Sequence, residues 1–579
     1  MHTPLIPVKP YQRIFLQPNI HYNTWHQLAD FAQELIEQEI HSTKDLIHFL
    51  EKKNELRIVV LEQKNWLALQ SYRYLNDATI KEEKAYFLKE VWESYSVTQN
   101  ELNQKIIHSP FLQDLMTAQP EMQTMILNLT TQHKIHSEKN AALFKQLDTL
   151  TANYNKITAA QKITIDNKVI SIHQAYRVAK DKDISTRKII SSNIHKRLLE
   201  DADALSDIYS EMVQLRHQVA QNAGYENFQA YIWDEKSRIH YTPTDCHNLC
   251  QVIQKHLMPV YKNIVDKRKQ CLQQDVLLDC DMHVELGTTP SHVYSEISPA
   301  FMDKLQQVFG KIDSEFATLF KYLNEEKRFD LEARSDKAFA MFTDYMPESK
   351  LPFVFYMPLT SLHDIHASIH EITHAFHSLY MNPLDLAGLQ DTGAEVSELF
   401  TLSMELISSE HWGVFFEDEQ HLIRAKLKKI EHCLALFRMI ALWDQFQSWV
   451  YTHPTHSKTE RNIFWDQLEK QYDVGISTGT QQQADNNTAW QNRPLIFRAP
   501  FYLIEYGFAQ LGACVLYQKY KTNPTQTIEN LIAAMKLGNT RSLQEIYETA
   551  GVNFDFSEDY VVEIADFLRA EYDRLFGLL

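Results

Sequence analysis

The 579-residue chain is predicted to be mostly α-helical, with one short β-sheet. Over most of its length, apolar residues recur three or four positions apart, which is the spacing of amphipathic helices. The chain contains only 13 Gly and 18 Pro. So few turn-forming residues in a chain of this length favour long helices over many short strands.

Helical patterning runs through the N-terminal half of the chain, with one break. Residues 20–160 form successive amphipathic stretches, with charged residues between the apolar positions. Residues 161–169 alternate and include an Asp-Asn pair, which predicts a short hairpin or an extended link. The helical pattern resumes over 170–275, and the mixed stretch 276–300 is expected to be rich in loops.

One later segment has the composition of β-strands. Residues 337–358 are aromatic and β-branched, and prolines punctuate them. Within this segment, 351–356 is predicted to be a strand, and its prolines favour a position at the edge of a sheet. From 361 to the end, the apolar spacing again predicts helices.

Charge and composition narrow the range of functions. The formal net charge is -18, which argues against nucleic acid as a main partner. The chain has no run of 18 apolar residues and no apolar run of signal-peptide length near its N-terminus. We therefore expect no membrane span and a cytoplasmic location. The six cysteines are scattered, which is typical of reduced thiols in a cytosolic protein.

The strongest chemical signal is the pentapeptide from His370 to His374, of the pattern His-Glu-x-x-His. Two histidines at positions i and i+4 lie about 40° apart on a helix, close enough to share one metal ion. Neutral imidazole suits zinc, and Glu371 between them can take a proton from zinc-bound water. The bare pattern occurs by chance in roughly one chain in ten of this histidine content, so it needs supporting context.

The surrounding segment, 361–380, supplies that context because it is predicted to be a single helix with two stripes. One stripe is apolar and consists of Ile365, Ile369, Ile372, Phe376 and Leu379. The other consists of His363, His366, His370, His374 and His377. A helix that is apolar on one side and lined with histidines on the other is expected to border a cleft. His366 and His377 are expected to support the metal site or form its wall, without binding the metal.

A catalytic zinc ion needs a third protein ligand, and the next predicted helix, which starts near Asp391, contains three candidate glutamates. Thr392 and Glu395 match a capping box, which gives Glu395 a structural role. Glu398 and Glu405 are seven residues apart and share one helix face. Glu398 is therefore predicted to be the third ligand, with Glu405 supporting the ligands from outside.

These segments resemble the M3 family of zinc oligopeptidases, in particular its oligoendopeptidase F branch. The matching stretches are LHDIHASIHEITHAFHSLY (362–380), GAEVSELFTLSMEL (393–406) and PFYLIEYGFAQLGA (500–513). The family has a glutamate some 25 residues after the second histidine, and Glu398 follows His374 by 24. Because the resemblance is clear only over the later part of the chain, we expect an N-terminal helical region over 1–180 and a catalytic region over 181–579.

The resemblance implies a gluzincin-like fold, with a large helical ellipsoid, a deep substrate channel and a small sheet beside the active site. It implies one zinc ion per chain, bound by His370, His374 and Glu398. It also implies that the strand near 352–356 pairs with the extended backbone of a peptide substrate.

The activity implied by the resemblance is that of a zinc endopeptidase acting on internal bonds of short, unstructured peptides. Glu371 would act as general base and later as proton donor. Tyr502 and Tyr506 would donate hydrogen bonds to the developing oxyanion.

The chain departs from the family at two positions. Leu495 and Leu503 stand where the family usually has a histidine and a tyrosine, so the part of the site that faces the substrate is reduced. Two alternatives follow from this region. One is a zinc carboxypeptidase or dipeptidase in which Arg493 or Arg498 holds the substrate's terminal carboxylate. The other is a zinc-containing peptide-binding protein with little turnover.

Overall fold

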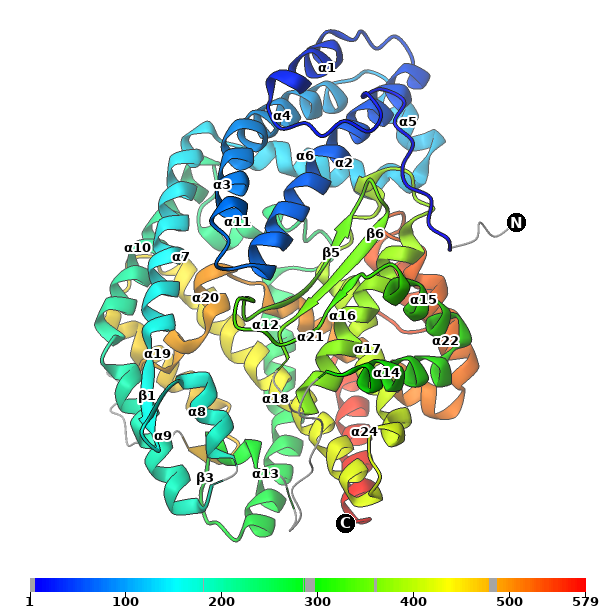
Figure 1. The fold of residues 1–579 in the computed structure, drawn as a ribbon. Coiled ribbons are helices and arrows are strands. Elements are labelled where there is room, and N and C mark those ends of the chain that lie inside the picture. The colour runs from blue at the N-terminus through cyan, green and yellow to red at the C-terminus, as the bar shows by residue number, and fades with distance from the viewer. Residues whose placement is uncertain (1–5, 181, 285, 287–296, 359–361, 478–486) are drawn as a thin grey trace. The chain divides into compact units, whose positions relative to one another are not determined.

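The computed structural model describes residues 6–180, 182–284, 286, 297–358, 362–477 and 487–579. The described part is built mainly from helices, which confirms the predicted mostly α fold class (Figure 1). The chain forms two compact units, each assembled from three separate stretches. The first unit comprises 1–133, 292–419 and 512–554, and the second comprises 134–291, 420–511 and 555–579. The predicted division at residue 180 stays a prediction.

The first unit contains helices from both ends of the chain around a three-stranded sheet. Its helices are α1 (His26–Glu37), α2 (Thr43–Arg73), α3 (Ala78–Phe87), α4 (Glu93–Ile107), α5 (Leu112–Ala118), α6 (Gln123–Ile135), α14 (Pro299–Ile312), α15 (Ser314–Glu325), α16 (Leu362–Met381), α17 (Ala394–Ser408), α22 (Pro524–Met535) and α23 (Leu543–Ala550). Its strands are β4 (Phe329–Asp330), β5 (Met341–Met346) and β6 (Leu351–Tyr356).

The second unit is also helical. Its helices are α7 (Ala141–Ala160), α8 (Ile172–Ala179), α9 (Ile184–Leu199), α10 (Ala202–Asn222), α11 (Phe228–Glu235), α12 (Pro243–Val252), α13 (Met258–Leu272), α18 (Glu419–Thr452), α19 (Lys458–Gln471), α20 (Pro494–Arg498) and α24 (Glu558–Phe576). Its strands are β1 (Lys162–Ile165), β2 (Lys168–Ser171), β3 (Leu277–Leu278) and β7 (Ile476–Ser477). Helix α21 (Leu503–Thr522) runs from the second unit into the first.

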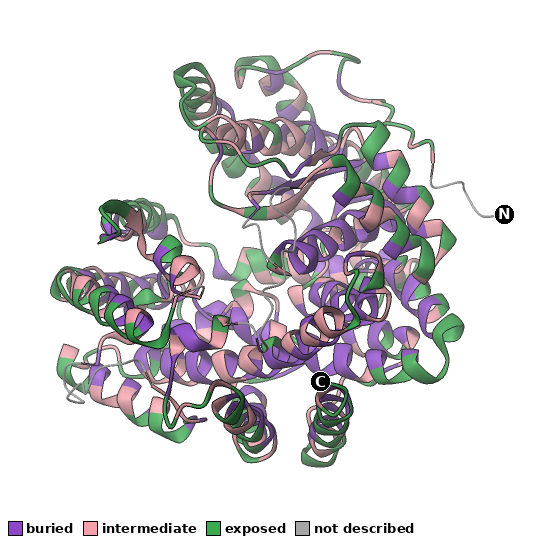
Figure 2. Cartoon of the chain, turned by 60° about the horizontal axis from the view of Figure 1, so that its bottom comes forward, coloured by how far each residue is buried: buried purple, intermediate pink, exposed green. Residues whose placement is uncertain are grey.

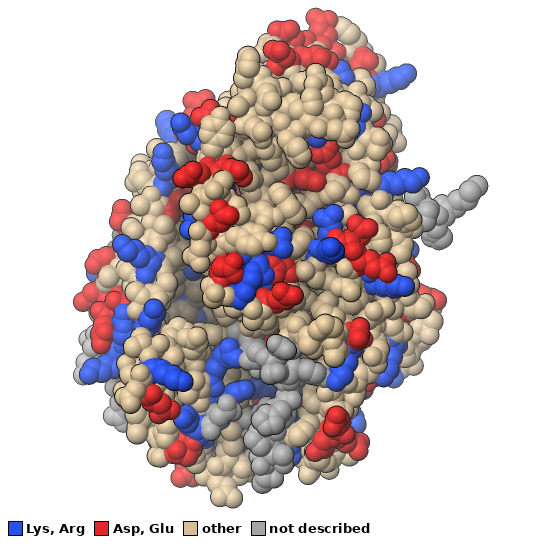
Figure 3. Space-filling view, viewed as in Figure 1, with Lys and Arg blue, Asp and Glu red and all other residues tan. Residues whose placement is uncertain are grey.

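The helices bury the apolar sides that their sequence spacing predicts, and Figure 2 shows buried residues on one side of many helices and exposed residues on the other. In the N-terminal helices, Leu28, Leu35, Leu46 and Phe49 belong to one buried cluster. Figure 3 shows acidic and basic side chains interspersed on one face of the molecule. None of the described helices is both long and apolar enough to cross a membrane.

The predicted hairpin at 161–169 is confirmed. Strands β1 and β2 pair antiparallel, with Lys162 opposite Ser171 and Ile165 opposite Lys168. Asp166 and Asn167 form the two-residue turn with φ of 51° and 62°. This is the turn geometry that suits the twist of a tight hairpin, and Asn and Asp tolerate positive φ better than most residues.

The sheet of the first unit corrects one expectation. Its strand order is β4-β6-β5, so the strand 351–356 is central and does not lie at an edge. The edge strands are β4 and β5, of which β5 is the longer, so the expected pairing of 352–356 with a substrate backbone loses its basis in an edge position. Hydrogen-bonded and non-hydrogen-bonded residue pairs alternate along the antiparallel strands β5 and β6. Met357 N donates to Ala340 O, so that pair is hydrogen-bonded, and the pair of Pro352 and Tyr345 falls at a position without hydrogen bonds. The backbone of residue 352 therefore points away from β5, and β4 pairs only with residues 354 and 355. No ladder hydrogen bond is lost at Pro352, which has no N–H to donate.

Candidate metal centre

Helix α16 carries the centre, and its apolar stripe anchors it. Ile365, Ile369, Ile372, Phe376 and Leu379 are fully buried, which confirms the predicted stripe. Phe376 contacts the rings of Phe309 and Phe316, on α14 and α15, at centroid distances of 5.0 and 5.4 Å. This packing fixes the rotation of the helix, and the rotation decides where the histidines point.

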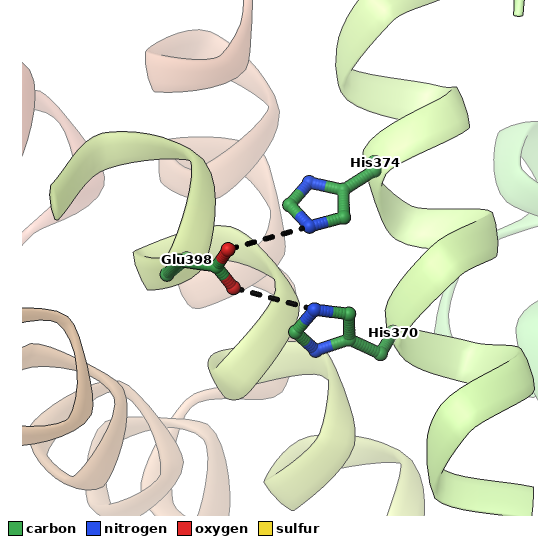
Figure 4. Close-up of side chains that lie close together, drawn as sticks. All are labelled: His370, His374 and Glu398. Atoms are coloured by element: carbon green, nitrogen blue, oxygen red, sulfur yellow. Dashed lines mark ion pairs between the residues drawn. The ribbon is translucent and has the colours of Figure 1, made fainter. Parts of the chain in front are cut away.

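The structure brings together His370, His374 and Glu398, the three residues predicted to bind metal (Figure 4). His370 Nε2 lies 3.3 Å from one carboxylate oxygen of Glu398, and His374 Nε2 lies 3.6 Å from the other. One donor atom from each residue lies within 4.8 Å of the other two. In the described part of the chain, no other set of three such side chains gathers this closely.

The charges of the site fit a cation. Three buried carboxylates, those of Glu371, Glu398 and Glu405, accompany the two imidazoles. Burial by itself would lower the pKa of His370, but the carboxylates, led by Glu398, outweigh it and raise that pKa to about 9. Burial and the neighbouring His370 hold the pKa of His374 well below its usual range. Three carboxylates around two imidazoles give the site an excess of negative charge, which a divalent metal ion would compensate.

Other side chains form hydrogen bonds to the candidate metal ligands. His370 Nδ1 lies 2.8 Å from Oε1 of Glu405, so its other ring nitrogen faces Glu398. Thr401 Oγ1 donates to Oε2 of Glu398 at 2.9 Å. A histidine that binds metal through one nitrogen is typically held at the other by a carboxylate. Glu405 makes the contact that such a supporting residue would make, and its role stays a prediction.

Glu371 lies in the same buried environment and has its own partner. It is 3% exposed, and burial, opposed chiefly by the charge of His370, raises its pKa to about 7. Thr343 Oγ1 on β5 lies 2.9 Å from Oε2 of Glu371 and 2.7 Å from its backbone oxygen. A carboxylate with a pKa near neutrality is well matched to taking up and returning a proton.

The capping box expected at Thr392 and Glu395 is wrong. Helix α17 begins at Ala394 with Gly393 as its N-cap, and no side chain caps it. The carboxylate of Glu395 folds back over Gly393, where a Cβ would lie 2.5 Å from Oε2. The missing side chain at Gly393 leaves room for this buried carboxylate, and the helix consequently starts one residue later than a Thr392 cap would require.

The remaining predicted histidines are buried against aromatic rings. His366 packs on Trp412 with a centroid distance of 4.9 Å, and His377 packs on Phe400 at 4.7 Å. Both side chains are buried, whereas His363 is exposed. The histidine stripe of α16 is therefore largely covered by other elements of the first unit.

Tyr502 and Tyr506 belong to the second unit. Their hydroxyl oxygens lie 3.2 Å apart, and Lys236 lies 5.2 Å from the centroid of the Tyr502 ring. The preceding residue, Phe501, has a φ of 61° although it is bulky and fully buried. Its N–H donates to Gln447 Oε1 at 2.9 Å, and its carbonyl accepts from Arg238 Nη2 at 2.5 Å. Such a strained residue persists only when its surroundings hold it, and strain of this kind concentrates at functional sites.

Comparisons with known proteins identify the family of the chain. The sequence pattern of peptidase family M3 matches residues 317–566, and the pattern of the peptidase M3 N-terminal domain matches residues 15–135. The chain belongs to peptidase family M3. It is therefore a metallopeptidase, and the matched region from 317 contains the candidate ligands His370, His374 and Glu398.

Individual relatives of this M3 peptidase are distant in sequence and close in fold. An oligoendopeptidase F homolog of Borreliella burgdorferi is 20% identical over 445 residues, which cover 72% of each chain. The structure of Pz peptidase A with an inhibitor superposes with a TM-score of 0.88 at 19% identity, covering 96% of this chain and 99% of the other. A Bacillus anthracis protein with a provisional assignment as oligoendopeptidase F gives 0.84 at 20% identity, with 97% and 99% coverage.

Two residues of this M3 peptidase that contact the site were not found by sequence reasoning. Thr401 lies three residues after Glu398 on the same helix, and that spacing could have revealed it. Thr343 lies 28 residues before Glu371, on a strand, and carries no local signal. Only the packing of β5 against α16 brings its hydroxyl to the carboxylate.

The four residues on which the alternative functions rest all lie in the second unit of the M3 peptidase. Leu495 is half-buried in α20, and Leu503 is buried at the start of α21. Arg498 is exposed and donates to Asn155 Oδ1 on α7. Arg493 is half-buried, and its guanidinium lies 5.8 Å from the centroid of the Trp443 ring.

Proposed function

We propose that this M3 peptidase is a zinc-dependent endopeptidase that hydrolyses internal bonds of short, unstructured peptides. The observation that carries the proposal is the convergence of His370 Nε2 and His374 Nε2 on the two oxygens of Glu398. Two histidines and one glutamate are a donor set of catalytic zinc sites, in which a fourth position stays open for water or substrate. One zinc ion per chain would be held by these three residues.

In the proposed mechanism, the zinc ion and Glu371 have different roles in hydrolysis. The zinc ion would supply Lewis-acid polarisation of the substrate carbonyl and make water acidic enough to lose a proton near neutral pH. Glu371 would take that proton as the water oxygen forms its bond to the carbonyl carbon. When the carbon–nitrogen bond breaks, Glu371 would return the proton to the leaving amine nitrogen.

The sheet supports an extended peptide as substrate. β5 lies at the edge of the sheet, with β6 as its only strand partner among the described residues. Its residue Thr343 contacts Glu371 directly, so the edge and the general base are neighbours. An extended peptide can pair with the edge of a sheet through backbone hydrogen bonds. These bonds are largely independent of the peptide's sequence, and they can form at any position along the peptide. This favours cleavage inside unstructured peptides.

Tyr502 and Tyr506 complete the proposal as donors to the oxyanion that develops on the carbonyl oxygen. The role comes from the family resemblance, and two local features support it. The two hydroxyls are already within 3.2 Å of each other, and the strained Phe501 precedes Tyr502. Preorganised donors of this kind contribute about 100-fold or more to the rate of acyl transfer.

The test compares the wild-type protein with Glu371→Gln. Bound zinc is measured in both, and cleavage of a mixture of short unstructured peptides is followed by mass spectrometry. We expect one zinc ion in both proteins, cleavage at internal bonds by the wild type and no cleavage by the variant. Glu395→Gln is the matched control, because Glu395 is a buried glutamate on α17 with no assigned part in the reaction.

Other outcomes contradict the proposal in different ways. If wild type and Glu371→Gln both bind zinc and neither cuts, the endopeptidase assignment is wrong and the alternative of a zinc-containing peptide-binding protein is favoured. If the wild type removes residues only from peptide ends, the endopeptidase assignment is wrong and a terminal carboxylate or amine is being recognised. If Glu395→Gln loses zinc, the choice of Glu398 as third ligand must be revised.

A further inference from the structure

Thr343 on β5 contacts the proposed general base, Glu371. Its hydroxyl lies 2.9 Å from Oε2 of Glu371 and 2.7 Å from the backbone oxygen of the same residue. The hydroxyl has a single proton, so it donates to one of these oxygens at a time or shares the proton between them. When the proton is shared, one hydroxyl ties both the main chain and the carboxylate of Glu371 to β5, and when it is given to Oε2 the hydroxyl ties the carboxylate.

The strand holds this hydroxyl rigidly. Thr343 lies opposite Val354 in the antiparallel pair of β5 and β6, and Val354 is fully buried. The neighbouring side chain, Phe342, faces the other side of the sheet, where its ring lies 5.1 Å from that of Tyr72 on α2. Because side chains alternate along a strand, Thr343 must face α16. Its β-branched side chain also has few rotamers, so the position of the oxygen is well defined.

Glu371 needs such a partner more than its neighbours do. His370 is held by Glu405, and Glu398 is held by Thr401, each through a short hydrogen bond. Glu371 has a longer and more flexible path from backbone to carboxylate than an aspartate, and it is not one of the three metal-binding residues. A general base works only when its oxygen lies within hydrogen-bonding reach of the proton that it takes.

We propose that Thr343 is a positioning residue for Glu371, an inference that rests on the proposed function. The hydroxyl holds Oε2, so that Oε1 is the oxygen that takes the proton from water and returns it to the leaving amine. Thr343 has no contact of its own with the reacting atoms in this scheme. It fixes which oxygen reacts and where that oxygen lies.

The experiment uses the full-length, zinc-loaded protein and two substitutions at one position. Thr343→Val keeps the shape of the side chain and removes the hydroxyl, whereas Thr343→Ser keeps the hydroxyl. We expect Thr343→Val to lower kcat by about ten- to a hundred-fold while KM stays within about twofold, because a misplaced base affects the chemical step and not substrate binding. Thr343→Ser should restore kcat to within about threefold of the wild type.

Bound zinc and two further threonines separate positioning from general damage. Thr343→Val should keep one zinc ion per chain, because the hydroxyl that it removes bonds Glu371, which is not one of the three proposed zinc ligands. Thr401→Val removes the hydroxyl from Glu398 instead, so it should weaken zinc binding. Thr373→Val is the control for a buried hydroxyl on α16 that bonds only a backbone oxygen, that of Ile369 at 2.7 Å, and it should leave kcat unchanged.

The outcomes distinguish this inference from the proposed function. If the wild type cuts peptides and Thr343→Val cuts them equally fast, the role of Thr343 is wrong while the proposed function stands. If Thr343→Ser is as slow as Thr343→Val, or if Thr343→Val loses its zinc, the threonine shapes the site structurally and does not position the base. If the wild type cuts no peptide, the proposed function fails, and the role of Thr343 fails with it.

Discussion

Oε1 of Glu405 lies 2.8 Å from Nδ1 of His370, while Nε2 of the same ring faces Glu398. The imidazole is thus held by a carboxylate at one nitrogen and presents the other to the metal position. The first prediction follows from this pair. Glu405→Ala should weaken zinc affinity by about 10- to 100-fold, because the ring loses the partner that fixes its orientation.

The measurement is a titration of each protein with a zinc chelator of known affinity. Glu405→Gln serves as the control, since its side-chain oxygen can still accept from Nδ1 of His370. We expect its affinity to fall less than that of Glu405→Ala. Equal affinities for wild type and Glu405→Ala would show that Glu405 does not support the metal centre.

The second prediction concerns the two tyrosine hydroxyls that lie 3.2 Å apart. Tyr502→Phe and Tyr506→Phe should each fold normally, and a tyrosine that donates to the oxyanion should lose about 100-fold or more in kcat when its hydroxyl is removed. Steady-state kinetics on one cleaved peptide gives the values. Tyr520→Phe is the control, because its hydroxyl pairs with His411 at 2.7 Å in the first unit. If both tyrosine variants match Tyr520→Phe, Tyr502 and Tyr506 serve packing only.

The third prediction concerns metal removal. Without a cation, the carboxylates of Glu371, Glu398 and Glu405 are buried together, which is unfavourable. Zinc bound to the folded state alone should raise the free energy of unfolding by about 2.7 kcal/mol when free zinc is 100 times Kd. Thermal unfolding with excess chelator and with added zinc measures this. An unfolding temperature that ignores zinc, in a protein with zinc bound, would contradict the assigned ligands.

The fourth prediction tests the support of the sheet beside the site. Asp330 on β4 is buried and receives hydrogen bonds from Arg73, Arg334 and Lys337 at 2.7–2.8 Å. Although burial raises the pKa of Asp330, these three cations outweigh it and hold the pKa well below its usual range. Asp330→Asn should lower the free energy of unfolding by about 3 kcal/mol near neutral pH, because it leaves the buried Lys337 and the two partly buried arginines without their carboxylate.

The pH dependence of the same substitution has a definite sign. A carboxyl whose folded pKa is depressed stabilises the protein above its unfolded pKa, about 3.9, and loses that contribution as pH falls toward the folded pKa. The difference in stability between wild type and Asp330→Asn should therefore shrink from about pH 5 to about pH 3. Denaturant unfolding at both pH values measures it. A difference that is constant over this range would show that the ionised carboxylate does not stabilise the sheet.

Local patterns in the sequence predicted several helices, one hairpin and the position of the candidate metal site. The apolar spacing predicted α16 with its buried stripe, and the Asp166-Asn167 pair predicted the β1–β2 hairpin. The spacing of His370, Glu371 and His374 predicted a shared metal position, because an α-helix puts residues four apart on one face. Each of these inferences depends on residues close together in the chain, where backbone geometry alone determines which side chains are neighbours.

Other features were decided only by tertiary structure. The prolines around 351–356 suggested an edge strand, yet pairing with β4 and β5 puts this strand at the centre and leaves the edges to those two strands. Gly393 caps α17 in place of Thr392, since a buried carboxylate occupies the space above it. Thr343 reaches Glu371 because β5 packs against α16. Contacts between segments distant in the chain depend on how whole elements pack, and no local period of the sequence encodes that.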